Sequence, residues 1–169
     1  YADQNDPEKA EEFYLKAIDI YEKLAADYPE KYNSDLATSY NSAGVFYADQ
    51  NDPEKAEEIF LKAIDIYEKL AADYPEKFNP DLGMSYNNAG NFYADQNDPE
   101  KAEEFYLKAI DIREKLAADY PEKFNPDLAV SYFNYAILKN NNKLFSKTLD
   151  IAKKCPGNPR CRKIIELLS

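Results

Sequence analysis

Apolar side chains recur at intervals of three and four residues along most of the chain, a spacing that places them on one face of an α-helix. One such stripe is Leu82, Tyr86, Ala89, Gly90 and Tyr93, and the next is Ala102, Phe105, Ala109, Ile112 and Leu116. The pattern predicts two amphipathic helices in succession. A glycine inside a helix costs roughly 1 kcal/mol relative to alanine, so Gly90 indicates that the two helices approach each other closely.

Helix start and stop signals flank both stripes. Asn79-Pro80-Asp81 and Asn97-Asp98-Pro99 each supply a capping side chain and a proline that fits the first turn of a helix. Pro121 ends the second stripe, because a proline disfavours helical geometry in the residue before it. We therefore expect helices over residues 80–96 and 99–119, folded back on each other in antiparallel fashion.

A single phrase, YADQNDPEKAEE, begins at Tyr1 and returns unchanged at Tyr47 and Tyr93, which gives a period of 46 residues. Such a period is typical of an array of helical repeats, in which each unit buries its apolar face against its neighbours. By this register, residues 1–4 form the last turn of a first helix and residues 7–27 form the second helix of the same repeat.

The period also predicts how the chain is divided. We expect a partial first repeat at 1–33, repeats at 34–79 and 80–125, a degenerate final repeat at 126–154, and a turn with a C-terminal capping helix at 155–169. In the final repeat Tyr135 replaces a small residue and Lys139 replaces an aromatic one. Residues 143–154 and 160–168 predict two shorter helices there, as degenerate terminal repeats usually cap such an array.

Seven spaced positions carry a family resemblance. In order, Tyr86, Ala89, Gly90, Tyr93, Ala102, Tyr106 and Ala109 resemble the signature of the tetratricopeptide repeat. The usual closing proline is absent, since Glu114 stands there, and in this respect the chain resembles the longer repeats of kinesin light chain type, with a few added linker residues. The resemblance implies an all-α fold, an α-solenoid of antiparallel helix pairs in a right-handed superhelix, and a protein-interaction scaffold whose first helices line a concave groove.

Side chains of the first helices that lie off the packing stripe would point into this groove. They are Thr38, Asn41, Val45 and Asp49; Met84, Asn87, Asn91 and Asp95; and Val130, Phe133 and Ile137. Differences between repeats are concentrated at these positions, while the second helices are almost constant. We expect amide side chains that bond an extended peptide backbone, with an apolar end near Phe133. Unconstrained variation of exposed positions would produce the same pattern.

Charge narrows the class of partner. The net charge of −11 divides into +5 for residues 127–169, with three acids and eight bases, and −16 for residues 1–126. An acidic array repels nucleic acid and anionic lipid, and no apolar run approaches the roughly 20 residues of a membrane span. Residues 34–50 and 80–96 contain no lysine or arginine, and Asp49 and Asp95 lie on the groove. We therefore expect a protein or peptide partner that is not acidic.

The residues of an enzyme or cofactor site do not gather in this sequence. It has no histidine, no glycine-rich phosphate loop and no metal-spaced cluster of cysteine and histidine. Asp49, Asn51, Asp52 and Glu54 resemble a calcium loop faintly, but the glycine that the sharp turn requires is absent. We expect no catalysis, no cofactor and no metal.

Cys155 and Cys161 bracket a Pro-Gly-Asn-Pro turn. The turn could bring the two thiols together as a disulfide, and the alternative is two ordinary free cysteines. A disulfide would favour a compartment outside the cytoplasm, whereas two free thiols would favour the cytoplasm.

Three other hypotheses remain open at the level of sequence. The acidic front, the basic back and an uncovered face carrying Phe13, Ala17 and Ile20 suit a spacer that associates head to tail with itself. The chain also suits a regulatory repeat arm of a larger protein. Near identity of the repeats suits recent duplication or an engineered repeat protein.

Overall fold

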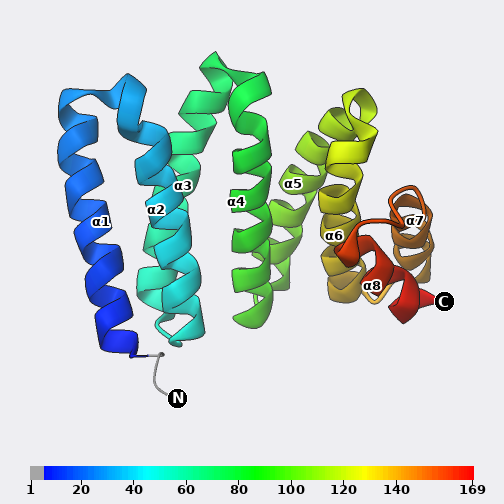
Figure 1. The fold of residues 1–169 in the computed structure, drawn as a ribbon. Helices are drawn as coiled ribbons and strands as arrows, with labels where there is room; N and C mark the ends of the chain where they lie inside the picture. The colour runs from blue at the N-terminus through cyan, green and yellow to red at the C-terminus, as the bar shows by residue number, and fades with distance from the viewer. Residues whose placement is uncertain (1–5) are drawn as a thin grey trace, which may run out of the picture. The chain divides into compact units, whose positions relative to one another are not determined.

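The computed structural model describes residues 6–169 and folds them entirely into helices, turns and short connections (Figure 1). The helices are α1 (Pro7–Asp27), α2 (Pro29–Asp49), α3 (Pro53–Asp73), α4 (Pro75–Asp95), α5 (Pro99–Asp119), α6 (Pro121–Lys139), α7 (Asn142–Ala152) and α8 (Pro159–Leu168). The last turn of a first helix, predicted for residues 1–4, lies outside the described residues. The all-α fold of successive antiparallel helix pairs, consistent with an α-solenoid, is confirmed.

Contacts divide the chain into two compact units, Tyr1–Phe78 and Asn79–Ser169, and each is described by itself below. The predicted right-handed superhelix is a property of the whole array and not of either unit alone, so it stays a prediction. The division of the chain into repeats likewise stays a prediction.

The second helices of the repeats begin and end where the sequence predicts. α1 and α5 span 7–27 and 99–119, each with a proline in the first turn. Asp98 caps α5, since its Oδ1 accepts the backbone N–H of Lys101 at 3.0 Å, and Asp52 caps α3 through Lys55 at 3.2 Å. The turns before these caps hold an asparagine at positive φ, the left-handed conformation that asparagine tolerates better than most residues.

The first helices start earlier than predicted, and here the expectation is wrong. α4 begins at Pro75, so that Pro80 lies inside the helix instead of at its start. Pro80 lacks the N–H that would bond the carbonyl of Glu76, but Glu76 is exposed, and water can serve a carbonyl of the first turn. Pro126 lies inside α6 in the same way. The expected linker residues are therefore the opening turns of these helices.

A single tyrosine joins each second helix to the helix that follows. Tyr28, Tyr74 and Tyr120 are the C-caps of α1, α3 and α5, and each donates its backbone N–H to a leucine carbonyl at 2.8 Å. Tyr28 and Tyr120 are also the N-caps of α2 and α6. Their side chains are exposed, although the rings of Tyr74 and Tyr120 each contact the phenylalanine four residues later at 6.4 Å.

Close helix packing is built on small residues, as Gly90 indicated. A Cβ on Gly90 of α4 would lie 2.6 Å from Cδ1 of Tyr106 on α5, and a Cβ on Gly44 of α2 would lie 2.7 Å from Cδ1 of Phe60 on α3. Both distances are shorter than carbon atoms allow, so only glycine permits the ring to lie flat against the neighbouring helix.

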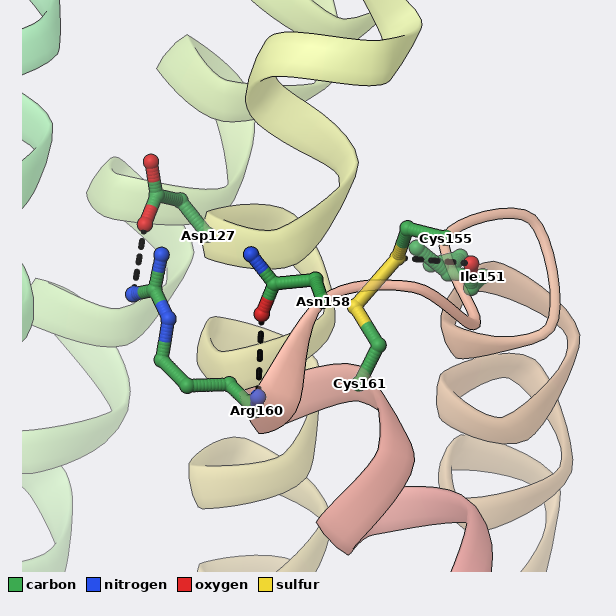
Figure 2. Close-up of a disulfide and its surroundings, with 6 residues drawn as sticks. All are labelled: Asp127, Ile151, Cys155, Asn158, Arg160 and Cys161. Atoms are coloured by element: carbon green, nitrogen blue, oxygen red, sulfur yellow. Dashed lines mark hydrogen bonds and ion pairs between the residues drawn. A yellow bond between two sulfur atoms is a disulfide. The ribbon is translucent and has the colours of Figure 1, made fainter.

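The C-terminal cap consists of α7 and α8, which pack on α6. Cys155 and Cys161 form a disulfide across the turn that precedes α8, so the first of the two predicted alternatives is the one observed (Figure 2). Asn158 caps α8 by accepting the N–H of Arg160 at 2.9 Å. Arg160 in turn pairs with Asp127 of α6 at 2.8 Å, which ties the cap to the last full-length helix.

Candidate partner-binding site

The predicted groove residues lie on α2 in the first unit and on α4 and α6 in the second. Exposed members are Thr38, Val45, Asp49, Met84, Asp95 and Ile137; half-buried members are Asn91, Val130 and Phe133; buried members are Asn41 and Asn87. Exposure therefore separates residues that can touch a ligand from residues that hold the helices together.

In the first unit, Thr38 is used within the fold although its side chain is exposed. Its Oγ1 lies 2.7 Å from the hydroxyl of Tyr67 on α3 and donates to the carbonyl of Ser34 at 2.8 Å. Val45 and Asp49 follow on the exposed face of α2. Asn41 lies on the same helix but is buried.

Asn87 is buried in the second unit, and the prediction that it offers its amide to a ligand is wrong. Its Oδ1 accepts hydrogen bonds from Nη1 of Arg113 at 3.3 Å and from the hydroxyl of Ser131 at 2.9 Å. Nη1 of Arg113 also donates to the Ser131 hydroxyl and to the carbonyl of Asp127 at 3.0 Å. This cluster joins α4, α5 and α6.

Sequence reasoning missed the role of Arg113. Burial lowers the pKa of its guanidinium to about 10, which the negative charge of Asp127 counteracts and the positive charge of Arg160 reinforces. The available signal was the exchange of Tyr21 for Arg113 in otherwise identical helices, since an arginine that replaces a half-buried tyrosine needs new acceptors.

Phe133 is not an open apolar end of a groove. Its ring packs edge-on against Phe145 of α7 at 6.4 Å, and Phe133 and Val130 both lie against the hydrophobic core of the second unit. Ile137, 56% exposed, is the most exposed of the predicted apolar groove residues.

One pocket collects three of the predicted residues. It has a volume of about 500 Å³ and is lined by Asn91, Ala94, Asp95, Tyr106, Asn134, Ile137 and Leu138. The residues come from α4, α5 and α6, all within the second unit. The structure thus brings Asn91, Asp95 and Ile137 together, and adds Tyr106 and Asn134, which sequence reasoning did not assign to the site.

The floor of this pocket is a polar triad. Oδ1 of Asn91 accepts from the hydroxyl of Tyr106 at 2.8 Å and from Nδ2 of Asn134 at 2.9 Å. These bonds orient both amides and direct their other ends, Nδ2 of Asn91 and Oδ1 of Asn134, away from the shared oxygen. An amide donor and an amide acceptor that line the same pocket suit the C=O and N–H groups of an extended peptide backbone.

The rim of the pocket is negative. Asp95 is exposed, and the pKa of Tyr106 is raised to about 12, first by burial and second by the negative charge of Asp95. Ile137 and Leu138 form an apolar wall beside it. The arrangement suits an aliphatic side chain next to a positive charge.

The polar floor is specific to this repeat. One period earlier the positions of Asn91 and Tyr106 hold Val45 and Phe60, so the donor and the acceptor are exchanged together for two apolar residues. This paired difference was the sequence signal that could have found Tyr106.

The described residues were also searched for metal sites and for membrane-spanning helices. Across residues 6–169, no group of three or more acidic or cysteine side chains is arranged to hold a metal ion. No helix in that range is both long enough and apolar enough to cross a membrane.

Comparisons with known proteins give the family. The family model described as tetratricopeptide repeat matches residues 1–69 and 35–115. The chain is similar in structure to BtubC (BKLC) from P. vanneervenii, with 21% identity and a TM-score of 0.65 over 96% of this chain, and it spans 57% of the length of that one. It is also similar in structure to a protein from Podosopora anserina described as a kinesin light chain, whose own TPR-like repeats are nearly identical to one another. The identity is 13%, the TM-score is 0.54, and the match covers 96% of this chain and 89% of that one.

A search of curated proteins returned no matching sequence. At the identities of the structural matches, the likeness concerns the fold. Because the family model covers well over half of the residues and the structure has the expected helix pairs, the chain belongs to the tetratricopeptide repeat family.

Proposed function

We propose that this chain is a non-catalytic interaction scaffold that holds an extended, neutral or basic peptide segment of a partner protein. Tetratricopeptide repeat folds are generally protein-interaction scaffolds. The observation that carries the more specific proposal is the pocket on α4, α5 and α6, with its polar floor, apolar wall and single carboxylate.

The floor supplies backbone recognition. Nδ2 of Asn91 donates to a peptide C=O, Oδ1 of Asn134 accepts from a peptide N–H, and the hydroxyl of Tyr106 keeps the first amide in place. Because both amides are already bonded to each other, little side-chain freedom is lost when the ligand binds. The accessible groove residues Met84 and Ile137 extend the contact along the same helices.

The rim supplies selectivity. Asp95 attracts a lysine or arginine of the ligand and repels a carboxylate, while Ile137 contacts an aliphatic neighbour. An exposed ion pair contributes only about 0.2 to 1 kcal/mol, so Asp95 sets preference more than affinity. Thr38, Val45 and Asp49 on α2 of the first unit stay predicted partner-binding residues, and the negative charge of Asp49 would likewise disfavour an acidic ligand.

Peptide selection tests this function. Dodecapeptides are selected from a random phage library on the intact chain, synthesised with fluorescein, and measured by anisotropy with lysine, glutamine or glutamate at the enriched basic position. We expect affinity to fall in that order. Asp95→Asn should narrow the difference in affinity between the lysine and glutamate peptides. Asp119→Asn, at an exposed carboxylate at the end of α5, should leave that difference unchanged.

A double variant tests the floor. Asn91→Val with Tyr106→Phe installs the pair that α2 and α3 already carry, so the fold should tolerate it, as circular dichroism would check. Loss of the amide contacts should weaken every selected peptide by about tenfold or more. If the double variant binds like the parent chain, the pocket is not the site.

A further inference from the structure

The segment that joins α7 to α8 carries a dense positive charge. Residues 153–163 contain five basic residues and no acidic one. Four of the bases are exposed and lie directly beside the two cysteines: Lys153, Lys154, Arg162 and Lys163. These four residues are called the basic patch below.

The disulfide brings the two halves of the basic patch together. It holds the Cα atoms of Cys155 and Cys161 6.0 Å apart (Figure 2). Lys154 and Arg162 are each one residue from a cysteine, so their Cα atoms lie within about 14 Å of each other, at about 3.8 Å per step of the chain. The long side chains of both halves can therefore reach the same short ligand.

The helix α8 turns its half of the basic patch outward. Cys161 and Ile164 face the core, with exposures of 0% and 4%, so Arg162 and Lys163 lie on the solvent side. Leu167 is 61% exposed and follows Lys163 by four residues, which places the two side chains next to each other on the helix surface. The basic patch thus has an apolar neighbour.

The charges of the basic patch are not neutralised within the fold. On α5, Lys108 and Lys115 each pair at 2.7 Å with an acid four residues earlier, and in the turn before α8 Arg160 pairs with Asp127. Among the ion pairs of residues 6–169, none involves a residue of the basic patch, although Glu166 is exposed on the same helix. These cations are therefore available to a ligand.

The position of the basic patch is also unfavourable for the folded chain by itself. The N-terminus of a helix is positive, so acidic residues in its first turn are stabilising and basic ones are not. Each of α1 to α6 has a glutamate in its first turn, whereas α8 has no acid there and carries Arg160 and Arg162 instead. Repulsion among the four patch residues adds to this cost, and bound carboxylates would relieve both effects.

From this arrangement we infer that the basic patch is a docking surface for a short acidic segment of a partner protein, whose carboxylates pair with the patch and whose aliphatic side chain contacts Leu167. Charge complementarity selects the ligand. A short segment is favoured over nucleic acid or an anionic membrane, because an extended polyanion is also repelled by the net charge of −16 on residues 1–126. This surface is separate from the pocket on α4, α5 and α6, and its preference is opposite to that of Asp95.

A fluorescein-labelled decapeptide of glutamates with one central leucine serves as the probe, and its glutamine analogue is the control peptide. We expect the acidic peptide to bind the oxidised chain at least about tenfold more tightly than the control, as measured by anisotropy at low salt. Added salt should weaken this binding, because exposed charges are screened.

Matched charge variants locate the surface. Arg162→Gln with Lys163→Gln should keep the fold, as circular dichroism would check, and weaken binding of the acidic peptide by at least about tenfold. Lys23→Gln with Lys69→Gln removes the same charge at exposed positions of α1 and α3 and should leave binding unchanged. Equal binding by the parent chain and the first variant, or an equal loss in both variants, would overturn the inference.

The role of the disulfide has its own variant. Cys155→Ser with Cys161→Ser keeps every charge but releases the two halves of the basic patch, so it should weaken binding by about threefold or more. Unchanged binding by this variant would contradict the part assigned to the disulfide.

Two further measurements separate this surface from other occupants. The pocket variant Asn91→Val with Tyr106→Phe should bind the acidic peptide normally, which distinguishes failure of this surface from failure of the proposed function. Tighter binding of a single-stranded oligonucleotide of matched charge would overturn the inference in favour of nucleic acid. A dimer in light scattering that Arg162→Gln with Lys163→Gln abolishes would overturn it in favour of a second copy of the chain.

Discussion

Nη1 of Arg113 donates to Oδ1 of Asn87 across 3.3 Å in the interior of the second unit. The other acceptors of this nitrogen, the Ser131 hydroxyl and the Asp127 carbonyl, are neutral as well. Arg113 is 7% exposed, so its positive charge is buried against these neutral acceptors, and the negative charge of Asp127 adds a further attraction. Removing the charge and removing its acceptor should therefore have unequal effects.

Replacing Arg113 by methionine should lower the free energy of unfolding by less than about 1 kcal/mol, since Ser131 still donates to Asn87 at 2.9 Å and a desolvated charge is removed. Asn87→Leu should lower it by about 2 to 3 kcal/mol, because the buried guanidinium loses an acceptor. Urea unfolding of both variants and of the double variant measures this. The double variant should be more stable than Asn87→Leu alone, and the opposite order would contradict the account.

Two glycines of α4 should respond in opposite directions to replacement by alanine. A Cβ at position 90 would lie 2.6 Å from Tyr106, whereas a Cβ at position 83 would have no neighbour nearer than 3.4 Å, a methyl of Ile112. Gly90→Ala should destabilise the chain by about 1 to 3 kcal/mol. Gly83→Ala should stabilise it by up to about 1 kcal/mol, the helix-propensity difference. Thermal unfolding of the two variants checks the sign of each change.

Sequence alone predicted α1 and α5 to the residue, because Asp-Pro at their starts and Pro at their ends leave one choice. It misplaced the start of α4, where Tyr74-Pro75-Glu76 and Asn79-Pro80-Asp81 are both good start signals. Choosing between them requires knowing that Glu76 lies on the exposed side of the helix, which is a property of the folded surface.

Alkaline pH should destabilise the fold through buried tyrosines. Burial raises the pKa of Tyr106 to about 12, and burial with a hydrogen bond to Glu103 raises that of Tyr135 to about 12. An unfolded tyrosine ionises near 10, so this stability is present below pH 10 and is lost as pH rises toward 12. Arg113 has the opposite effect on stability. Because its pKa is lowered to about 10 in the folded chain, the folded state gains stability from this group as pH rises above that value.

The measurement is the urea midpoint at pH 9 and at pH 11. We expect it to fall between these values, and to fall less in Tyr106→Phe than in the parent chain. Tyr120→Phe, altered at an exposed side chain, should retain the parent's fall. An equal fall in all three chains would rule out Tyr106 as a source of the effect.

Reduction of the disulfide should loosen α8 and leave the rest of the chain intact. Cys155 and Cys161 are six residues apart, and closing so short a loop contributes about 2 kcal/mol in the chain-entropy model. Hydrogen exchange of residues 159–168 should accelerate in a phosphine reductant. Exchange in α1 to α3 serves as the internal control, and unchanged protection of α8 would contradict the prediction.

The candidate site was accessible to sequence reasoning only in part. Helical periodicity identified the face that carries Asn91, Asp95 and Ile137, and the structure unites these residues in one pocket. The burial of Asn87 depends on Arg113, which is 26 positions away on another helix. No local pattern encodes such a contact, because it arises from the way in which three helices pack.

The tyrosine junctions allow the chain to be lengthened by inserting whole repeats. Tyr28, Tyr74 and Tyr120 adopt φ of −138°, −136° and −133° and ψ of 67°, 68° and 69°, and each is followed by a proline that opens the next helix. A copy of residues 75–120 placed after Tyr120 would meet the same Tyr-Pro step at both ends. Duplication or loss of whole repeats in the gene would then change the length of the array without requiring a new type of connection between helices.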